Sequence, residues 1–366
     1  MDFKEIEQIL SKEPRFRLKQ VKQSLFCDLI NNWPEAITLP LALRQKLGKE
    51  FPITIKAEEF KSKDSRTIKA LINLEDDLKI ESVLMQHNKS AAGSSLSATY
   101  SNPALRTPAF VQNPPRLTKD RNTVCVSSQV GCPLACGFCA TGRIGFERNL
   151  TSWEIIEQVL FFARYLKKEG QKISNIVFMG MGEPFLNYDN VIGAIRILHD
   201  KDGFNLGARH FSVSTCGITE GIEKLADEKL EINLAISLHA PNDELRSKLM
   251  PVNKKYSISQ ILKAVDEYIK ITRRRVMFEY IMIKDVNDSD SCAKELVKII
   301  NRPLYFVNLI SYNNFGNLTA DFKPSTNGRI KKFKEILEKA GVPITQRYRF
   351  GQDIKAACGQ LAYKSK

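Results

Sequence analysis

The chain has 366 residues, of which 43% are hydrophobic, enough for a full core and for two domains. No run of about 18 apolar residues is present, and the charged N-terminus lacks the apolar core of a signal peptide. We therefore expect a cytoplasmic protein without a membrane segment. The net charge of +14 favours a polyanionic partner such as RNA, although a basic surface without a special role would carry the same charge.

Residues 1–86 are expected to form a small accessory module that binds RNA. Hydrophobic spacing predicts helices over residues 3–10, 17–33 and 41–47, and Pro40 suits the first position of the third helix. Alternation of apolar and polar residues predicts short strands over residues 67–72 and 80–85. The start of the second helix carries four basic candidates for RNA contact: Arg15, Arg17, Lys19 and Lys22.

Residues 87–119 differ from the chain on either side. Small and polar residues come first, followed by a stretch that contains Pro103, Pro108, Pro114 and Pro115. Such a composition cannot bury enough apolar surface to fold alone. We predict a flexible insertion or linker here.

Residues 120–366 alternate between apolar, β-branched runs and amphipathic stretches. The runs predict seven strands, at residues 124–128, 175–179, 211–215, 232–238, 276–283, 304–310 and 344–350. Helices are predicted between them, at residues 152–168, 190–199, 258–271, 291–300 and 329–340. This order indicates an α/β fold with parallel strands. A complete or open barrel fits best, with its active site at the C-terminal ends of the strands, and a doubly wound sheet is the alternative.

The cysteines carry the strongest chemical signal. Eight cysteines in a chain expected in the cytoplasm indicate metal binding or catalysis rather than disulfides. Cys132, Cys136 and Cys139 form a CxxxCxxC motif directly after a predicted strand. Three thiolates on a [4Fe–4S] cluster leave its fourth iron open to a small molecule. Zinc is the alternative, but it would need a fourth ligand such as Cys125. Three further cysteines belong to no motif and are predicted to be structural: Cys27, Cys216 and Cys292.

This spacing resembles that of the radical S-adenosylmethionine (radical SAM) superfamily. The resemblance implies an open or partial TIM-like (β/α)6 barrel, with S-adenosylmethionine bound at the open iron and cleaved to a 5′-deoxyadenosyl radical. It also implies that Phe138 lies against the cofactor. Further blocks at residues 124–132, 178–184, 237–243 and 353–359 make nearly the whole chain similar to RlmN/Cfr-type RNA adenine methyltransferases. The positions that match cofactor contacts are Gly182, Glu183, Ser214, Ser237, Leu238, His239 and Asn313. Asn314 follows Asn313 where the family usually has proline.

The resemblance further implies methylation of adenine carbon 2 by a covalent route, because this carbon is electrophilic and resists direct methyl transfer. One S-adenosylmethionine methylates Cys358 in the C-terminal segment. The second supplies a radical that takes a hydrogen from the S-methyl group, and the resulting carbon radical adds to adenine. Cys125 then releases the product and forms a disulfide with Cys358. Glu81 matches the position of the proton acceptor.

The implied partners are 23S ribosomal RNA, the anticodon loop of tRNA, and an electron donor such as flavodoxin or ferredoxin, with the protein as a monomer. Two other functions stay open. One is a Cfr-like carbon-8 methyltransferase that confers antibiotic resistance, which Pro184 disfavours. The other is a non-catalytic metal-containing RNA-binding protein, which leaves Cys125 and Cys358 without a role. The basic candidates for phosphate contact in the main domain are Arg143, Arg148, Arg273, Arg274, Arg275, Arg347 and Arg349.

Overall fold

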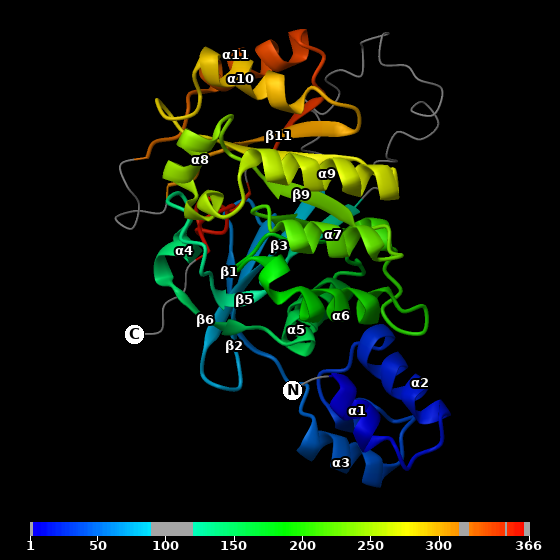
Figure 1. Ribbon diagram of the computed structural model, residues 1–366. Helices are drawn as coiled ribbons and strands as arrows, with labels where there is room; N and C mark the ends of the chain where they lie inside the picture. The colour runs from blue at the N-terminus through cyan, green and yellow to red at the C-terminus, as the bar shows by residue number, and fades with distance from the viewer. Residues whose placement is uncertain (1–2, 89–119, 315–321, 348–349, 362–366) are drawn as a thin grey trace.

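The computed structural model describes residues 3–88, 120–314, 322–347 and 350–361 (Figure 1). Most of the predicted insertion at 87–119, together with Arg349, lies outside the described residues. Within them, ten strands form one sheet in the order β1-β2-β3-β4-β7-β8-β9-β10-β11-β12, and β5 and β6 form a second, two-stranded sheet. None of the described helices is both long and apolar enough to cross a membrane.

The strands from β4 onward pair in parallel and in chain order. Parallel strands that pair in chain order form a barrel, whereas in a doubly wound sheet the order of the strands reverses near the middle of the sheet. Because the described sheet ends at β1 on one side and β12 on the other, the barrel is partial. All seven predicted strands are present: β4 (Asp120–Cys125), β7 (Asn175–Phe178), β8 (Phe211–Thr215), β9 (Asn233–Ser237), β10 (Val276–Met282), β11 (Tyr305–Ser311) and β12 (Ile344–Gln346).

The helices between these strands cover one side of the sheet, stacked in chain order (Figure 1). Capping boxes begin two of them, with Thr151 and Glu154 before α5 and Ser257 and Gln260 before α9. The predicted helices are found, and α7, α8 and the short α4 (Ala140–Ile144) are additional. The bounds are α5 (Ser152–Lys168), α6 (Tyr188–His199), α7 (Thr219–Asp227), α8 (Asp243–Leu249), α9 (Ile258–Thr272), α10 (Asp290–Ile300) and α11 (Asn327–Lys339).

The two faces of the barrel strands differ in chemistry. Residues such as Ile176, Val213 and Phe278 are buried and belong to the main hydrophobic core. The opposite face is polar, and the strand register places a row of polar residues side by side across β9, β10, β11 and β12: Ser237, Glu279, Asn308 and Thr345. Small polar side chains leave space that bulky residues would otherwise fill. This inner face is therefore suited to hold a polar ligand.

The N-terminal part combines helices with the two predicted strands, but a third strand, β1, was not predicted, the three strands extend the barrel sheet in antiparallel order, and one predicted helix is wrong. The helix expected at 17–33 ends at Cys27, and Leu29 has a φ of 53°. The chain turns there because Trp33 is buried, with its indole N–H on the carbonyl of Phe51 at 2.6 Å. The elements are α1 (Phe3–Ile9), α2 (Phe16–Lys22), the π-helical turn η1 (Gln23–Cys27), the 3-10 turn η2 (Trp33–Glu35), α3 (Leu41–Glu50), β1 (Lys56–Lys61), β2 (Thr67–Asn73) and β3 (Lys79–Asn88).

The N-terminal part and the barrel share one sheet and one core. Strand β3 pairs with β4 of the barrel, with Val83 opposite Cys125. The Phe51 ring lies 4.9 Å from that of Trp153 on α5, and Lys22 forms an ion pair with Asp200 after α6. The predicted division at residue 86 stays a prediction.

Candidate active site

The three motif cysteines lie on a loop that a short hairpin closes. Strands β5 (Gln129–Gly131) and β6 (Phe146–Asn149) flank this loop, and the Cys132 N–H donates to the carbonyl of Gly145 at 2.7 Å. Gly131 has a φ of 77°, and a Cβ there would lie 2.0 Å from the Gly145 oxygen. Glycine is therefore required for the hairpin to close.

The loop residues fit an iron–sulfur cluster better than a single metal ion. Burial raises the pKa of Cys132 well above its usual range and that of Cys139 to about 11, and the charge of Cys136 adds to both. The Leu134 N–H donates to Cys132 and the Gly142 N–H to Cys139, as N–H groups do at cluster sulfurs. Within the described parts of the chain, no three His, Cys, Asp or Glu side chains converge tightly enough for one ion. A cluster needs no such convergence, because each cysteine binds a different iron.

The turn after β7, residues 180–184, packs tightly on the strand end beside it. The Gly180 N–H donates to Val126, and a Cβ at Gly180 would lie 2.6 Å from that carbonyl. Gly182 has a φ of 100° and lies against the side chain of Gln129. Glu183 is buried, and its carboxylate accepts the backbone N–H of Cys216 at 2.7 Å and that of Phe185 at 3.1 Å. Burial raises the pKa of Glu183. This carboxylate thus ties the turn to the end of β8.

The other predicted cofactor positions lie at the C-terminal ends of β8 and β9. The hydroxyls of Ser214 and Ser237 are 3.4 Å apart, and Leu238 is buried behind them. His239 has a φ of 58° and accepts the Ile281 N–H at Nδ1, which assigns the proton of the neutral ring to Nε2. Its ring meets that of Phe138 edge to face at 4.8 Å. The structure therefore joins the cysteine loop to these strand ends.

Arg246 on α8 is a site residue that sequence reasoning missed. It is fully buried, and its guanidinium donates to the carbonyls of Cys216, Ser237 and Leu238, with NH2 to the Cys216 oxygen at 2.6 Å. These bonds hold the ends of β8 and β9 in place.

Cys216, predicted to be only structural, has its thiol hydrogen-bonded to that of Cys136. The only feature of the sequence that could have pointed to Cys216 as a site residue is its position directly after a predicted strand.

The C-terminal segment returns to the cysteine loop. The Ala140 N–H of α4 (Ala140–Ile144) donates to the carbonyl of Gly359 at 2.8 Å, and the Thr141 hydroxyl donates to that of Leu361 at 2.6 Å. Asn313, after β11, donates to the carbonyl of Cys358 at 3.3 Å. The predicted cofactor position Asn313 thus also orients the predicted catalytic cysteine.

Cys125 and Cys358, far apart in the sequence, lie close enough for the charge of Cys358 to act on Cys125. Burial raises the pKa of Cys125 to about 12, and Cys358 adds to this effect. Burial also raises the pKa of Cys358, while the guanidinium of Arg347 lowers both values. Arg347, predicted as a phosphate contact, therefore lies beside the two thiols.

Glu81 lies on the same face of the sheet as Cys125, because Val83 is opposite Cys125 and Glu81 lies two positions away on β3. Its carboxylate is buried and forms an ion pair with Lys69 of β2 at 2.7 Å. The Glu81 N–H also contacts the sulfur of Met181 in the turn after β7. Sequence analysis missed Lys69 because the pairing depends on the register of β2 and β3.

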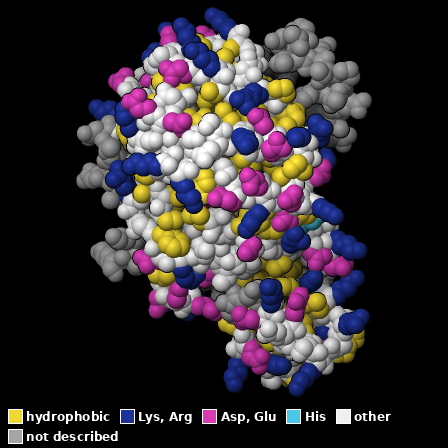
Figure 2. Space-filling model, in the orientation of Figure 1, with side chains coloured by type: hydrophobic (Ala, Val, Ile, Leu, Met, Phe, Trp, Pro, Cys, Tyr) yellow, Lys and Arg dark blue, Asp and Glu magenta, His cyan; other side chains and the backbone are white. Residues whose placement is uncertain are grey.

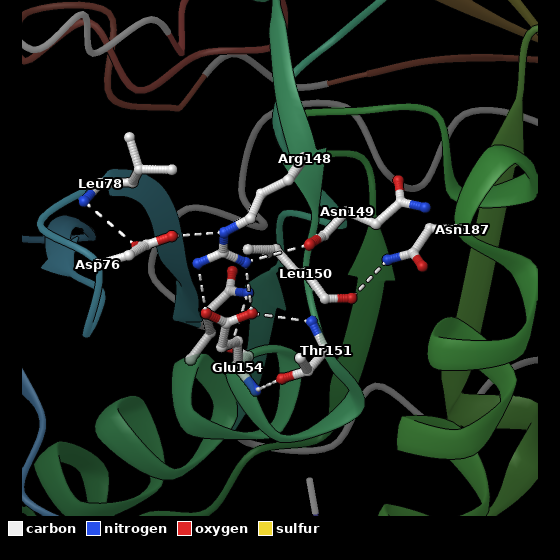
Figure 3. Close-up of polar contacts among 9 residues, drawn as sticks. Asp76, Leu78, Arg148, Asn149, Leu150, Thr151, Glu154 and Asn187 are labelled. Carbon is white, nitrogen blue, oxygen red and sulfur yellow. Dashed lines mark hydrogen bonds and ion pairs between the residues drawn. The ribbon is translucent and has the colours of Figure 1, made fainter. Parts of the chain in front are cut away.

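Several basic candidates for RNA contact have intramolecular partners. Arg148 binds Asp76 at 2.6 Å and Glu154 at 2.8 Å (Figure 3), and Lys19 lies 3.9 Å from Asp202. Arg274 donates to Asn233, and the guanidinium of Arg275 lies over the Phe306 ring. Arg15, Arg143 and Arg273 are exposed. On the face drawn in Figure 2, basic and acidic side chains are interspersed.

Residues 126–294 match the family model of the radical SAM superfamily. The chain is 43% identical over 365 residues to a probable dual-specificity RNA methyltransferase RlmN of Dictyoglomus turgidum, covering 98% of this chain and 94% of the relative. It is 41% identical over 350 residues to the ribosomal RNA large subunit methyltransferase N of Nitrosopumilus maritimus, covering 95% and 92%. A solved radical SAM methyltransferase from Sphaerobacter thermophilus matches with a TM-score of 0.86 and 40% identity, covering 99% of this chain and 97% of that one.

The partial barrel, the three-cysteine loop and these matches define a radical SAM protein, a class that uses a [4Fe–4S] cluster and S-adenosylmethionine. Within this class, the chain belongs to the RlmN family of radical SAM RNA methyltransferases.

Proposed function

We propose that the protein methylates carbon 2 of an adenine in 23S ribosomal RNA and in the anticodon loop of tRNA, with two molecules of S-adenosylmethionine per turnover. The names of its relatives support this proposal, since they include dual-specificity RNA methyltransferases and a large-subunit ribosomal RNA methyltransferase. The net charge of +14 suits a polyanionic substrate.

When bound, the cluster and S-adenosylmethionine supply an electron, a deoxyadenosyl radical and a methyl group. Cys132, Cys136 and Cys139 hold the cluster, and their positions, with Cys136 buried and the other two half-buried, limit the access of water to it. The residues that contact S-adenosylmethionine are Gly182, Glu183, Ser214, Ser237, Leu238, His239 and Asn313. Their common place at the C-terminal ends of the barrel strands and in the adjoining turns supports this assignment.

The association of Cys125 with Cys358 beside the cysteine loop is the observation that carries the proposal. Cys358 accepts the methyl group on its sulfur and presents it to the adenine ring. Cys125 then attacks the sulfur of Cys358, so that a disulfide forms and the bond between that sulfur and the carbon attached to adenine breaks. The electron pair of the broken bond stays with this carbon, which takes up a proton and becomes the methyl group of the product. An external thiol reduces the disulfide before the next turnover.

Glu81 accepts the proton that leaves carbon 2. Its place on the same face of the sheet as Cys125, where the ion pair with Lys69 at 2.7 Å holds the carboxylate, supports this role. The base must leave its stack to reach these groups, so basic residues of the N-terminal part hold the surrounding RNA backbone. Arg15 and Lys19 are exposed there. The protein acts as a monomer, with flavodoxin or ferredoxin as electron donor.

Mass spectrometry of the nucleosides from treated RNA tests this function. Anaerobically reconstituted enzyme should contain about four irons per chain and produce 2-methyladenosine in unmodified 23S RNA and tRNA. Formation of 8-methyladenosine would instead support the Cfr-like activity. Zinc in place of iron, with no modified nucleoside, would support a non-catalytic RNA-binding protein.

A cysteine variant tests the covalent route in the same assay. Cys358→Ala should keep its iron and make no product. Cys292→Ala, at a half-buried cysteine of α10, is the matched control and should keep full activity. Product formation by Cys358→Ala would exclude the proposed role of this residue.

A further inference from the structure

The cysteine loop reaches the surface between α4 and the end of α8. The Gly137 N–H donates at 2.9 Å to the carbonyl of Leu249, the last residue of α8, and a Cβ at Gly142 of α4 would lie 2.9 Å from the backbone nitrogen of Cys136. Figure 1 shows α4 and α8 next to each other on one side of the barrel. Cys132 and Cys139 are only half-buried, so the cluster that they hold lies close to this surface.

Three exposed non-polar residues lie around the first cysteine of the loop. Pro133 and Ala135 are both exposed, between Cys132 and Cys136. Phe146 begins β6 and is 42% exposed, although its backbone pairs with Gly131, the residue before Cys132. Non-polar side chains that gather on a surface mark a site where a partner binds.

Basic residues border this non-polar centre on two sides. The only charged residue in the stretch 131–146 is Arg143, which is exposed. Beyond the end of α8 follow two exposed cations, Lys254 and Lys255, in a stretch, 248–255, that contains no acidic residue. Within the described parts of the chain, Arg143 and Lys254 form no ion pair. Positive charge on this surface is therefore available to a partner.

A non-polar centre with a charged border is typical of a protein interface. Electron-transfer partners form small, weak complexes in which opposite charges steer the encounter and the non-polar centre gives close contact. RNA presents phosphates to a protein surface, and phosphates leave a non-polar centre without a partner. A negatively charged protein therefore fits this surface better than RNA does.

We propose that this surface, called the cluster-side surface, docks an acidic protein that delivers single electrons to the cluster. It consists of Pro133, Ala135, Arg143, Phe146, Lys254 and Lys255. The inference rests on the proposed function, in which cleavage of S-adenosylmethionine needs one electron from outside the chain. The donor is oxidised by one electron and the cluster is reduced by one, and no bond forms or breaks between them. Because electron transfer slows steeply with distance, the donor has to approach where the cluster ligands are only half-buried.

Binding of an acidic flavodoxin to anaerobic, cluster-loaded enzyme tests the proposal. Biolayer interferometry gives the Kd without RNA or S-adenosylmethionine. Lys254→Glu/Lys255→Glu should raise the Kd about tenfold at low salt, and the difference should shrink at high salt, because the attraction between the charges is screened. Phe146→Ser should raise the Kd at both salt concentrations, because the contribution of the ring is non-polar.

A matched control separates this surface from the overall charge of the protein. Lys331→Glu/Lys332→Glu makes the same change of charge at two adjacent, exposed lysines of α11, which lies apart from α4 and α8 (Figure 1). This variant should bind flavodoxin like the wild type. An equal rise in the Kd of both double variants would overturn the proposal, because it would mean that only net charge matters.

Cleavage of S-adenosylmethionine provides a second readout. With reduced flavodoxin as electron donor, Lys254→Glu/Lys255→Glu should cleave the cofactor several-fold more slowly than the wild type at low donor concentration. With dithionite, a small reductant that needs no docking surface, the two rates should be equal. An unchanged Kd in this variant, with normal iron content, would overturn the proposal. If the variant loses its iron, an unchanged Kd in Phe146→Ser would overturn it.

The same variants distinguish the donor from RNA and from the proposed function. Weaker binding of tRNA by Lys254→Glu/Lys255→Glu with an unchanged Kd for flavodoxin would assign the surface to RNA and overturn the proposal. Methylated RNA formed with dithionite, together with an unchanged Kd, would leave the function standing and remove the docking surface. Weaker binding of flavodoxin in the absence of any methylated RNA would support the surface and contradict the function.

Discussion

His239 combines an unusual backbone conformation with a buried, neutral ring. Its φ of 58° turns the chain at the end of β9, and its Nδ1 accepts the N–H of Ile281 on β10. Burial, together with the charge of Arg246, lowers its pKa to about 3. The ring also meets Phe138 of the cysteine loop. One side chain thus fixes the loop against two strand ends, provided that it stays neutral.

This pKa predicts sensitivity to acid. In the folded protein His239 takes up a proton only near pH 3, whereas in the unfolded chain it does so near pH 6.5. The stability that the neutral ring contributes is therefore fully present above pH 6.5 and falls as the pH drops below it. Between pH 7.5 and 5.5 the free energy of unfolding should fall by about 1 kcal/mol, which lowers Tm by about 1–2 °C. Calorimetry of the wild type and His239→Asn at both values tests this.

The variant should lose less stability on acidification than the wild type. His87, whose pKa burial lowers to about 4, is present in both proteins and cancels in the comparison. His210→Asn, at an exposed histidine, should behave as the wild type. An equal loss in His239→Asn and the wild type would contradict the argument.

At the scale of elements, Arg148 ties three segments together (Figure 3). It lies on β6, the return strand of the cysteine hairpin, and its guanidinium binds Asp76 in the turn between β2 and β3. It also binds both carboxylate oxygens of Glu154, at 2.8 and 2.9 Å, in the first turn of α5. Glu154 in turn completes the capping box with Thr151. The hairpin therefore depends on the N-terminal sheet extension for its position.

Replacement of Arg148 by lysine should weaken its contacts with both Asp76 and Glu154. Lysine keeps the charge but cannot form the bidentate contact, so we expect a loss of about 1–2 kcal/mol. Hydrogen exchange should rise in residues 74–78 and in β6 together. Arg209→Lys, which breaks a bidentate pair with the exposed Glu231, is the matched control and should leave the stability nearly unchanged, because solvent screens this pair. Faster exchange in β6 alone would mean that Asp76 does not contribute.

At the scale of the whole molecule, the C-terminal segment joins the two ends of the open sheet. Phe350 meets His87 of β3 at 4.6 Å, and the backbone N–H of Lys63, after β1, donates to Asp353 at 2.8 Å. Gly351, with a φ of 60°, lies directly against Thr67 of β2. The segment then reaches the cysteine loop. The C-terminal segment therefore covers the open side of the barrel and also brings Cys358 near Cys125.

Mild oxidation should therefore link Cys125 to Cys358. Treatment with diamide, followed by non-reducing digestion and mass spectrometry, should detect this disulfide in the cluster-loaded protein, because the two thiols lie close enough for the charge of one to act on the other. Cys358→Ala should abolish it. Cys27, exposed near α6 with its thiol on the carbonyl of Gly203, should form no link to either residue. A Cys358 disulfide to any other cysteine would contradict the placement.

The local features of this protein follow from short stretches of chain. The spacing of Cys132, Cys136 and Cys139 places three donors on one loop, and the alternation of apolar runs with amphipathic stretches predicts each barrel strand within a few residues. Glycines such as Gly131 mark the tight turns. These features depend on steric and hydrophobic preferences that act between near neighbours, so they can be deduced without the fold.

The rest depends on how the sheet curves and which strands meet. The sequence offered no reason to place Arg347 beside the two thiols rather than on the surface, to set Cys216 against Cys136, or to end the predicted helix at Cys27. Each outcome depends on a partner distant in the chain, such as Met179 for Arg347 and Phe51 for Trp33. Charge and hydrophobicity tell which residues need partners, but strand register and burial, which only the folded chain sets, decide which partners they find.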